Sequence, residues 1–356
     1  MIMRRWSTLA LAASLLAVAA CSGGDGSVLE ATSRPGGDTA MVPLPDLGPR
    51  TYLGSQGGLY PGGLNDPPTA HAAAGRAAAA AIVPLGRDGQ PGAGGRIVLL
   101  SVGMSNTTME FCSGNFPQCG AWTFAGQAAA DPAVNHSTLV IVDGARGGQT
   151  TSAWASPALP QYDSANARLA RAGVTESQVQ VVWLKQANPQ PTASMPGTGA
   201  DAYLLEKGLG DVVRALKNRY PNLKQVFLSS RIYGGYASTT LNPEPYAYEG
   251  GFAVKWLIEA QINQMQQAIA GTTLIDGRAG NLSYDGVVPW LAWGPYLWAS
   301  GAKPRADGLV WLPQDYQADG THPGQSGQQK VGKLLLDFFE TSPFTRCWFL
   351  AGQRCS

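Results

Sequence analysis

The sequence is poor in charge. Asp, Glu, Lys and Arg make up 14% of its 356 residues, against roughly 25% in an average soluble domain. The 25 basic and 24 acidic residues leave a formal net charge of +1. Proteins that bind nucleic acid mainly through phosphate groups are usually strongly basic, so this balance argues against a nucleic-acid partner. Apolar residues make up 44% of the chain, which is enough to bury a sizeable core.

Metal-binding patterns are also scarce. The chain has three histidines and no CxxC motif, so we expect no metal site, and no organic cofactor is implied. With Cys21 set aside, four cysteines remain, and they allow three disulfide pairings. The local pairing would close two short loops, by joining Cys112 to Cys119 and Cys347 to Cys355.

A long hydrophobic run is missing as well. The apolar stretch over residues 9–20 follows two arginines and is about 12 residues long, whereas a membrane span needs roughly 20. This pattern is typical of a secretory signal peptide.

The stretch ends in Leu16-Ala-Val-Ala-Ala-Cys21, which resembles a bacterial lipobox. The resemblance implies a signal peptide over 1–20, lipidation of Cys21 and anchoring to the cell envelope. Ser22 favours the outer membrane if the cell has two. The alternative is an ordinary signal peptide with an incidental cysteine.

The remainder is predicted to form a tether and one domain. Residues 22–40 are rich in Gly, Ser and Asp, a composition typical of flexible linkers, so we assign 21–50 to a tether. No internal repeat or second low-complexity linker follows, and we assign 51–356 to a single domain. A monomer held by its N-terminus is expected, with the lipid anchor as its contact with the membrane.

Short apolar runs alternate with amphipathic stretches along this domain. The near-continuous apolar runs suit strands that are buried on both faces of a parallel sheet. The alternation predicts a three-layer α/β/α sandwich with a mainly parallel five-stranded sheet, of the flavodoxin-like kind. Strands are predicted over 96–102, 138–143, 178–184, 224–229 and 308–312. Helices are predicted over 69–81, 201–220, 247–270 and 325–340.

Polar residues follow several of these strands, where ligands bind in such folds. Ser105 follows the first strand, and Gly148 lies in the glycine-containing stretch after the second. Asn188 follows the third strand. Asp319 and His322 come directly before the last helix. The Asp-x-x-His spacing allows the carboxylate to accept the second imidazole N–H, which would fix the histidine tautomer.

In this order, the four blocks resemble the SGNH (GDSL-type) hydrolase superfamily over roughly residues 96–340. The resemblance implies a Ser105–His322–Asp319 triad, with an oxyanion hole formed by the Ser105 and Gly148 N–H groups and the Asn188 amide. The sequence has Gly-Met-Ser in place of Gly-Asp-Ser and Ala-Asn-Pro in place of the usual x-Asn-Asp. The choice between Gly144, Gly147 and Gly148 stays open.

The same residues allow other interpretations. Ser105 could cap a helix, His322 could be a surface side chain, and Asn188-Pro could be a simple turn. An α/β-hydrolase is disfavoured, because it requires G-x-S-x-G and Thr107 replaces the second glycine. His71 and His136 are interpreted as structural.

Aromatic residues concentrate in residues 290–298 and 233–236. They suit either packing of an irregular segment or contact with a sugar ring, and Arg231, Tyr233 and Trp293 are candidate substrate-lining residues. The expected function is hydrolysis of an acyl ester, with acetyl as the acyl group and a polysaccharide as the carrier. Two alternatives stay open. One is transfer of the acyl group to an envelope glycan, and the other is a non-catalytic envelope binding protein.

Overall fold

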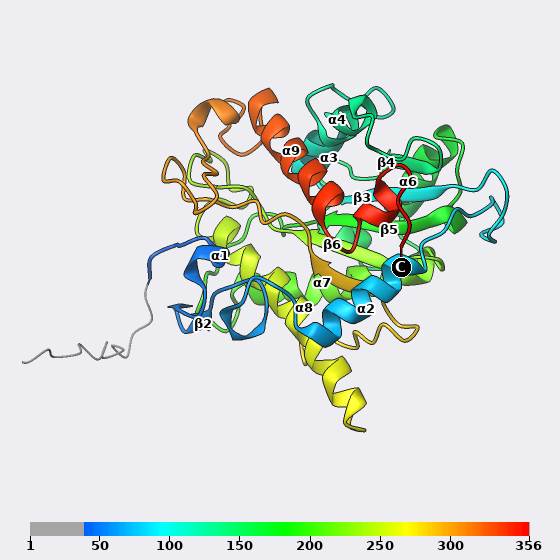
Figure 1. The fold of residues 1–356 in the computed structure, drawn as a ribbon. Coiled ribbons are helices and arrows are strands. Elements are labelled where there is room, and N and C mark those ends of the chain that lie inside the picture. Colours follow the sequence, from blue (N-terminus) through cyan, green and yellow to red (C-terminus); the bar gives the residue numbers. More distant parts are fainter. Residues whose placement is uncertain (1–38, 356) are drawn as a thin grey trace, which may run out of the picture. The chain divides into compact units, whose positions relative to one another are not determined.

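A computed structural model describes residues 39–355, which lie in one compact unit (Figure 1). The predicted signal peptide, Cys21 and the first part of the predicted tether lie outside the described residues. Within residues 39–355, no helix is both long enough and apolar enough to cross a membrane.

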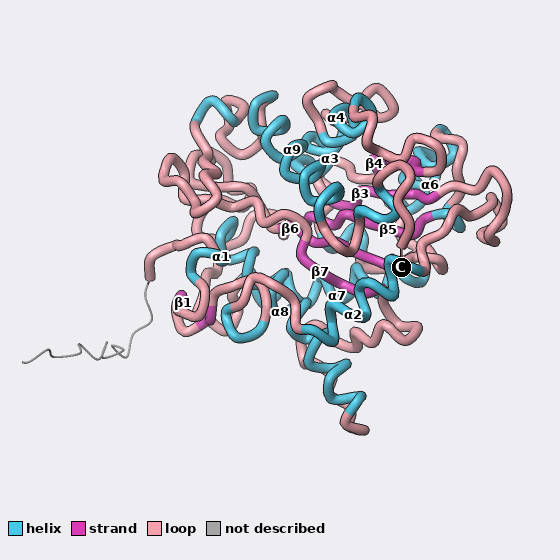
Figure 2. Tube along the Cα trace, viewed as in Figure 1, coloured by secondary structure: helices cyan, strands magenta, loops and turns pink. Residues whose placement is uncertain are grey.

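The centre of the fold is a parallel five-stranded sheet with the order β4-β3-β5-β6-β7 (Figure 2). Every residue of β3, β5, β6 and β7 is buried, as expected for strands covered on both faces. The predicted fold class is therefore confirmed. The strands are β3 (Ile97–Gly103), β4 (Leu139–Asp143), β5 (Val179–Lys185), β6 (Gln225–Ser229) and β7 (Trp290–Trp293).

The predicted fifth strand was wrong. Residues 308–312 form a loop, and the edge strand beside β6 is β7. The backbone N–H of Trp311 donates to the Gly301 carbonyl at 2.8 Å, and its indole donates to the Leu297 carbonyl at 2.8 Å. The backbone and indole N–H groups of Trp311 therefore bond to neighbouring loop residues. The aromatic stretch that begins at Trp290 forms the edge strand instead.

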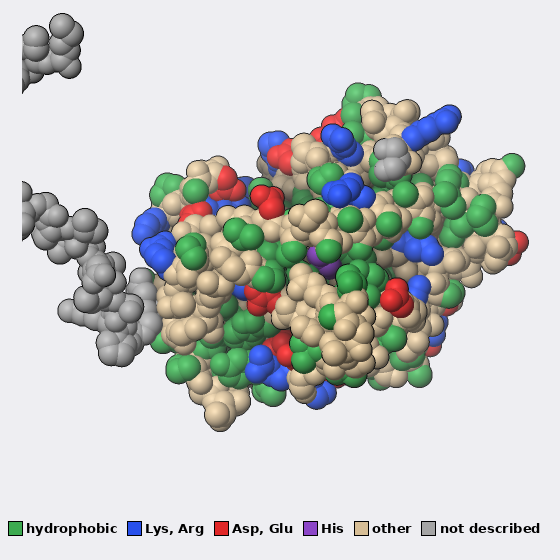
Figure 3. All heavy atoms as spheres, turned by 60° about the horizontal axis from the view of Figure 1, so that its bottom comes forward, with side chains coloured by type: hydrophobic (Ala, Val, Ile, Leu, Met, Phe, Trp, Pro, Cys, Tyr) green, Lys and Arg blue, Asp and Glu red, His purple; other side chains and the backbone are tan. Residues whose placement is uncertain are grey.

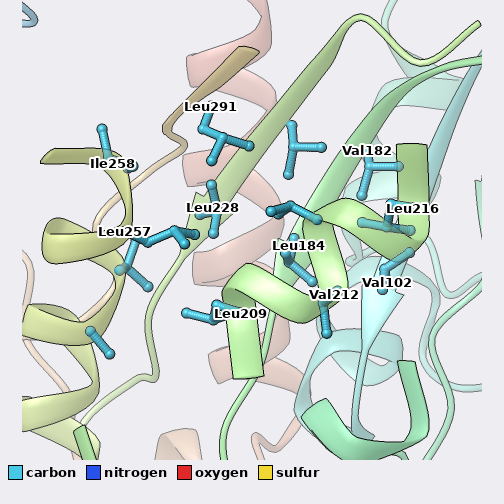
Figure 4. Packing of buried hydrophobic residues seen from close by; sticks show 14 of the residues in the cluster. Val102, Val182, Leu184, Leu209, Val212, Leu216, Leu228, Leu257, Ile258 and Leu291 are labelled. Carbon is cyan, nitrogen blue, oxygen red and sulfur yellow. The ribbon is translucent and has the colours of Figure 1, made fainter. Parts of the chain in front are cut away.

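Helices cover both faces of the sheet, and alternate strand residues point to opposite sides. One hydrophobic cluster joins Val182, Leu184 and Leu228 to α7 (Asp201–Arg219) and α8 (Tyr246–Ile269), as Figure 4 shows, and also includes residues of α6 (Pro160–Arg171). The second cluster joins Val181 and Phe227 to helices on the other face. These are α2 (Thr69–Ala80), α3 (Ser105–Cys112), α4 (Phe124–Ala130) and α9 (Gln325–Thr341). The four predicted helices are confirmed as α2, α7, α8 and α9.

Short elements complete the described fold. The strands β1 (Thr51–Tyr52) and β2 (Ser55–Gln56) form an antiparallel pair. The helices α1 (Leu44–Leu47), α5 (Thr151–Trp154) and α10 (Arg346–Phe349) each span a single turn. The local disulfide pairing is the one present, between Cys112 and Cys119 and between Cys347 and Cys355.

The end of the predicted tether belongs to the folded body. Leu44 and Leu47 on α1 are fully buried in the first cluster. The N–H of Leu44 donates to the Tyr296 hydroxyl at 3.3 Å. These buried leucines belong to the folded domain although a linker-like composition precedes them. The predicted boundary between tether and domain at residue 50 therefore lies too far along the chain.

Helix α2 docks against β7 through a close contact. The His71 ring stacks on the Trp290 indole, with 5.0 Å between ring centroids, and its Nε2 bonds the Leu291 carbonyl at 2.8 Å. Gly75 lies one turn further along α2. A Cβ atom at Gly75 would come within 2.3 Å of the Trp290 Cζ2. Helix α2 therefore packs on the face of β7 with no space for a side chain at position 75.

We predict that His71 makes stability depend on pH. Burial lowers the pKa of His71 to about 4, below its value of about 6.5 in an unfolded chain. Above pH 6.5, His71 is neutral in both the folded and the unfolded chain, and its contribution to the free energy of unfolding is complete. Between pH 6.5 and pH 4, the unfolded chain takes up a proton that the folded protein does not, so the free energy of unfolding falls by up to about 3 kcal/mol. Denaturant unfolding of the wild type and His71→Gln at pH 7 and pH 4.5 measures this loss. An equal pH dependence in both proteins would contradict it.

We also predict that Gly75→Ala destabilises the protein by about 1–3 kcal/mol, because the added methyl group overpacks the Trp290 contact. The matched control is Gly250→Ala on α8, where the added Cβ meets only the Leu205 side chain at 3.5 Å. There the helix propensity of alanine should make the change neutral or stabilising by up to about 1 kcal/mol. Urea unfolding of both variants tests the difference, and equal effects would argue against the overpacking.

Candidate active site

The predicted polar residues gather where the parallel strands end. Ser105 is the first residue of α3, which begins directly after β3. Gly148 and Asn188 lie in the loops after β4 and β5, and His322 lies in the loop before α9. All four line one cavity of about 220 Å³. The carboxyl ends of neighbouring parallel strands thus bring together residues that lie far apart in the sequence.

Ser105, His322 and Asp319 form a continuous hydrogen-bonded chain. The His322 Nε2 lies 2.8 Å from the Ser105 Oγ, and its Nδ1 lies 2.5 Å from the Asp319 Oδ2. The other Asp319 oxygen accepts the backbone N–H groups of Thr321 and His322, at 2.9 and 3.0 Å. With Nδ1–H donated to Asp319, Nε2 is the nitrogen that accepts the serine proton.

Asp319 is held in its ionised form. Partial burial raises the pKa of this carboxyl, but the backbone and side-chain hydrogen bonds from His322 outweigh the burial and bring the pKa below its ordinary value. A carboxylate that stays charged beside the imidazole can stabilise an imidazolium. The arrangement therefore suits a histidine that takes up a proton from Ser105.

Asn188 is fixed by two neighbours. Its Oδ1 accepts the Thr151 hydroxyl at 2.7 Å, and its Nδ2 donates to the Asp201 Oδ1 at 3.0 Å. These bonds set the orientation of the amide and leave its second N–H for a group in the cavity. Because α5 and α7 supply the two neighbours, both helices position this donor.

The structure separates the candidate glycines after β4. The N–H of Gly144 donates to the Ser101 carbonyl at 3.1 Å, so this donor is already used. Gly148 lines the cavity and has a φ of +77°, a left-handed conformation that glycine adopts without a steric penalty. Gly147 is not among the residues that line the cavity. Of the three, Gly148 is the one that lines the cavity.

A buried carboxylate beneath this loop was missed by sequence analysis. Asp143 accepts the hydroxyls of Ser101 and Thr108, each at 2.5 Å, and the Arg168 guanidinium at 3.1 Å. Burial raises its pKa to about 6. The network joins β3, β4, α3 and α6 directly behind the Gly148 loop. Asp143 was hard to single out from the sequence, because a polar residue often ends a strand.

A buried ion pair behind Ser105 was missed as well. Lys185 at the end of β5 and Glu110 on α3 are both fully buried, and the Lys185 Nζ lies 2.5 Å from each Glu110 oxygen. Burial lowers the pKa of Lys185 to about 8 and raises that of Glu110. The pair, with the bond from the Thr107 hydroxyl to the Lys185 carbonyl at 2.8 Å, ties α3 to the central strand.

The cavity is mostly lined by uncharged groups. Figure 3 shows a face on which a histidine lies in a hollow framed by hydrophobic and uncharged polar side chains. The cavity is lined by Met104, Ser105, Asn106, Gly148, Thr150, Ala187, Asn188, Pro189, Arg231, Leu241, Asn242, Thr321 and His322. In residues 39–355, no cluster of three or more His, Cys, Asp and Glu side chains could hold a metal ion.

One of the three candidate substrate-lining residues lies where it was expected. Arg231 lines the cavity, but Tyr233 and Trp293 do not. Trp293 is 3% exposed on β7, and its indole donates to the Leu59 carbonyl at 2.7 Å. The Tyr233 ring packs edge-on against Tyr236, with 5.1 Å between the ring centroids. These two aromatic residues stabilise the fold, which is the packing alternative. Leu241 and Asn242 line the cavity without any signal in the sequence.

Comparisons with known proteins give distant likenesses only. No family model and no curated protein matches the chain. Among solved structures, the chain is similar to an extracellular lipase from Streptomyces rimosus, at 14% identity and a TM-score of 0.32 over 68% of this chain and 99% of that one. It is similar to a protein from Parabacteroides merdae described as a GDSL-like lipase, at 12% identity and a TM-score of 0.36 over 68% and 94%.

A third similar structure is a salicylyl-acyltransferase from a tetracycline biosynthetic pathway, at 13% identity and a TM-score of 0.34 over 72% of this chain and 58% of that one. At these identities and TM-scores the likeness says nothing about activity, which has to follow from the residues of the cavity.

We predict that Ser105 reacts with a fluorophosphonate probe and that Asp319→Asn slows this reaction about 10³–10⁴-fold, because the histidine then loses the tautomer that accepts the serine proton. Intact-protein mass spectrometry follows the labelling, and peptide mapping locates the modified residue. The matched control is Asp337→Asn, which removes an exposed carboxylate paired with Lys333 on α9 and should label at the wild-type rate. Labelling at another serine would rule out this assignment.

Proposed function

We propose that this protein is a serine esterase that hydrolyses acyl esters through Ser105, His322 and Asp319. The observation that carries the proposal is the 2.8 Å contact between the Ser105 Oγ and the His322 Nε2 inside a cavity that Gly148 and Asn188 also line. A nucleophile, its base and donors for a developing oxyanion therefore share one small space.

The first half of the reaction forms an acyl-enzyme. The Ser105 oxygen attacks the ester carbonyl carbon while its proton passes to the His322 Nε2, and Asp319 stabilises the imidazolium. The carbonyl oxygen becomes negative and is met by the N–H groups of Ser105 and Gly148 and by the Asn188 amide. Ser105 begins α3, and the first N–H groups of a helix have no partner within it. Collapse of the intermediate breaks the ester bond, and the alcohol leaves with the proton from His322.

The second half regenerates the enzyme. A water molecule gives its proton to His322 and attacks the acyl carbon, and the acid leaves as Ser105 recovers its proton. The cavity of about 220 Å³ suits a short acyl group, and we propose acetyl. We further propose a polysaccharide carrier in the cell envelope, reached by an exported monomer that a lipid on Cys21 anchors.

We expect Ser105→Ala to lower the hydrolysis of p-nitrophenyl acetate by about 10⁴–10⁶-fold, because a triad acts as a unit. The alanine variant should keep the wild-type circular dichroism spectrum and melting temperature. The matched control is Ser164→Ala, which removes an exposed hydroxyl on α6 bonded to the Pro160 carbonyl and should retain full activity. Equal rates in the wild type and Ser105→Ala would refute the esterase.

A second experiment separates hydrolysis from acyl transfer. With a sugar acceptor present, hydrolysis releases the free acid, whereas transfer yields the acylated sugar.

A further inference from the structure

A buried cation lines the cavity beside the nucleophile. Arg231 follows β6, is 5% exposed, and lines the same space as Ser105 and His322. Among the residues that line the cavity, it is the one whose side chain carries a fixed positive charge. A guanidinium removed from water is costly unless it meets an anion or several acceptors.

The nearby carboxylates are engaged by other donors. Glu110 acts electrostatically on Arg231, but Lys185 donates to both of its oxygens at 2.5 Å. Asp319 also acts on Arg231 from a distance, and its oxygens accept the His322 ring and backbone N–H groups. Neither forms an ion pair with Arg231 within the described part of the chain.

The third carboxylate near Arg231 is Glu244, and it too is satisfied elsewhere. It accepts the N–H of Gly234 at 2.7 Å, the N–H of Tyr248 at 2.9 Å and the Trp298 indole at 2.7 Å. The Arg231 guanidinium makes one long contact, from Nη1 to the Met104 sulfur at 4.0 Å. Its Nε is buried with no hydrogen-bond partner among residues 39–355.

Asn242, another residue that lines the cavity, also lacks hydrogen-bond partners in the described part of the chain. It is 3% exposed, lines the cavity, and has no hydrogen-bond partner for either its Nδ2 or its Oδ1 within the described residues. Its φ of +64° is in the left-handed region, which asparagine adopts more readily than most residues. A buried amide that lacks both partners is uncommon in a folded protein. The cavity is thus lined by a cation without a paired anion and by an amide whose two polar atoms have no partner among the described residues.

We propose that Arg231 and Asn242 bind a carboxylate carried by the ester substrate, so that the enzyme selects acidic over neutral esters. The inference rests on the proposed esterase function and names its substrate class. A carboxylate supplies the anion that Arg231 lacks and accepts the Asn242 N–H as well. The Asn242 Oδ1 is left to accept a hydroxyl, which makes an acetylated acidic sugar the favoured form of such a substrate.

Two matched pairs of esters test the proposal on the full chain. The first pair is an acetylated methyl glucuronoside against the same acetylated methyl glucoside, in which the carboxylate lies on the alcohol. The second pair is monomethyl succinate against methyl pentanoate, in which the carboxylate lies on the acyl group. We expect kcat/KM to favour the acidic member of at least one pair roughly 10- to 100-fold, the size of effect that a hydrogen bond to a charged group produces. The preferred pair tells on which side of the ester the carboxylate lies.

Variants assign that preference to the two residues. Arg231→Gln and Asn242→Ala should each bring the acidic-to-neutral ratio of kcat/KM close to one, mainly through KM for the acidic ester. The matched control Arg76→Gln removes the same charge from the exposed surface of α2 and should keep the wild-type ratio. Because loss of a buried arginine can disturb folding, each variant is compared with the wild type by circular dichroism. The acidic-to-neutral ratio of kcat/KM measured on the wild type tests the proposal even if a variant fails to fold.

The outcomes separate this proposal from the esterase assignment. Serine-dependent turnover with a ratio near one in both pairs overturns the carboxylate site and leaves the esterase in place. If none of the four esters is turned over, calorimetric titration with the acidic and the neutral member of each pair decides. Selective binding of an acidic member then supports the carboxylate site and overturns only the esterase, whereas equal or absent binding in both pairs overturns both.

Discussion

Burial of the parallel sheet on both faces is the constraint on which the rest of this structure depends. The strands pair with one another through their backbones, and helices seal both surfaces with apolar side chains. Little room is left for functional polar groups within the layers, so they collect where the strands end. Ser105, Gly148 and Asn188 follow three neighbouring strands for this reason, and His322 reaches them from the loop before α9.

Charged groups buried beneath the cavity hold these loops in place. Asp143 links two strands and two helices behind the Gly148 loop, and the pair of Lys185 and Glu110 fixes α3 against the central strand. Removing one partner from such a pair is far more harmful than its presence is stabilising, because a lone charge would then be buried. The position of α3, which begins at Ser105, therefore depends on polar contacts that are buried away from the cavity.

The sequence was sufficient for the layers, four of the five central strands and the long helices, because periodic burial is a local pattern. Ser105, Asp319 and His322 were singled out by the resemblance of the four blocks to a known superfamily, together with their positions after a strand and before the last helix. The sequence failed for the fifth strand, because the apolar residues near Trp311 and those near Trp290 look alike until their hydrogen bonds are known. It could not find Asn242 or the pairing of Lys185 with Glu110, which depend on contacts between distant segments. For the same reason Trp293 was assigned to the cavity, although it is buried at the end of β7 and its indole donates to the Leu59 carbonyl.

Two of the three residues in the hydrogen-bonded chain belong to one short loop. Asp319 and His322 are three residues apart, and the N–H of Gln317 donates to the His322 carbonyl at 2.8 Å. The acid and the base therefore form a small module whose internal geometry is independent of the length of chain that separates it from Ser105. Insertions between the strands can lengthen or remodel the rim of the cavity without disturbing this module. The loops around the cavity can therefore diverge while the hydrogen bonds within this module stay the same.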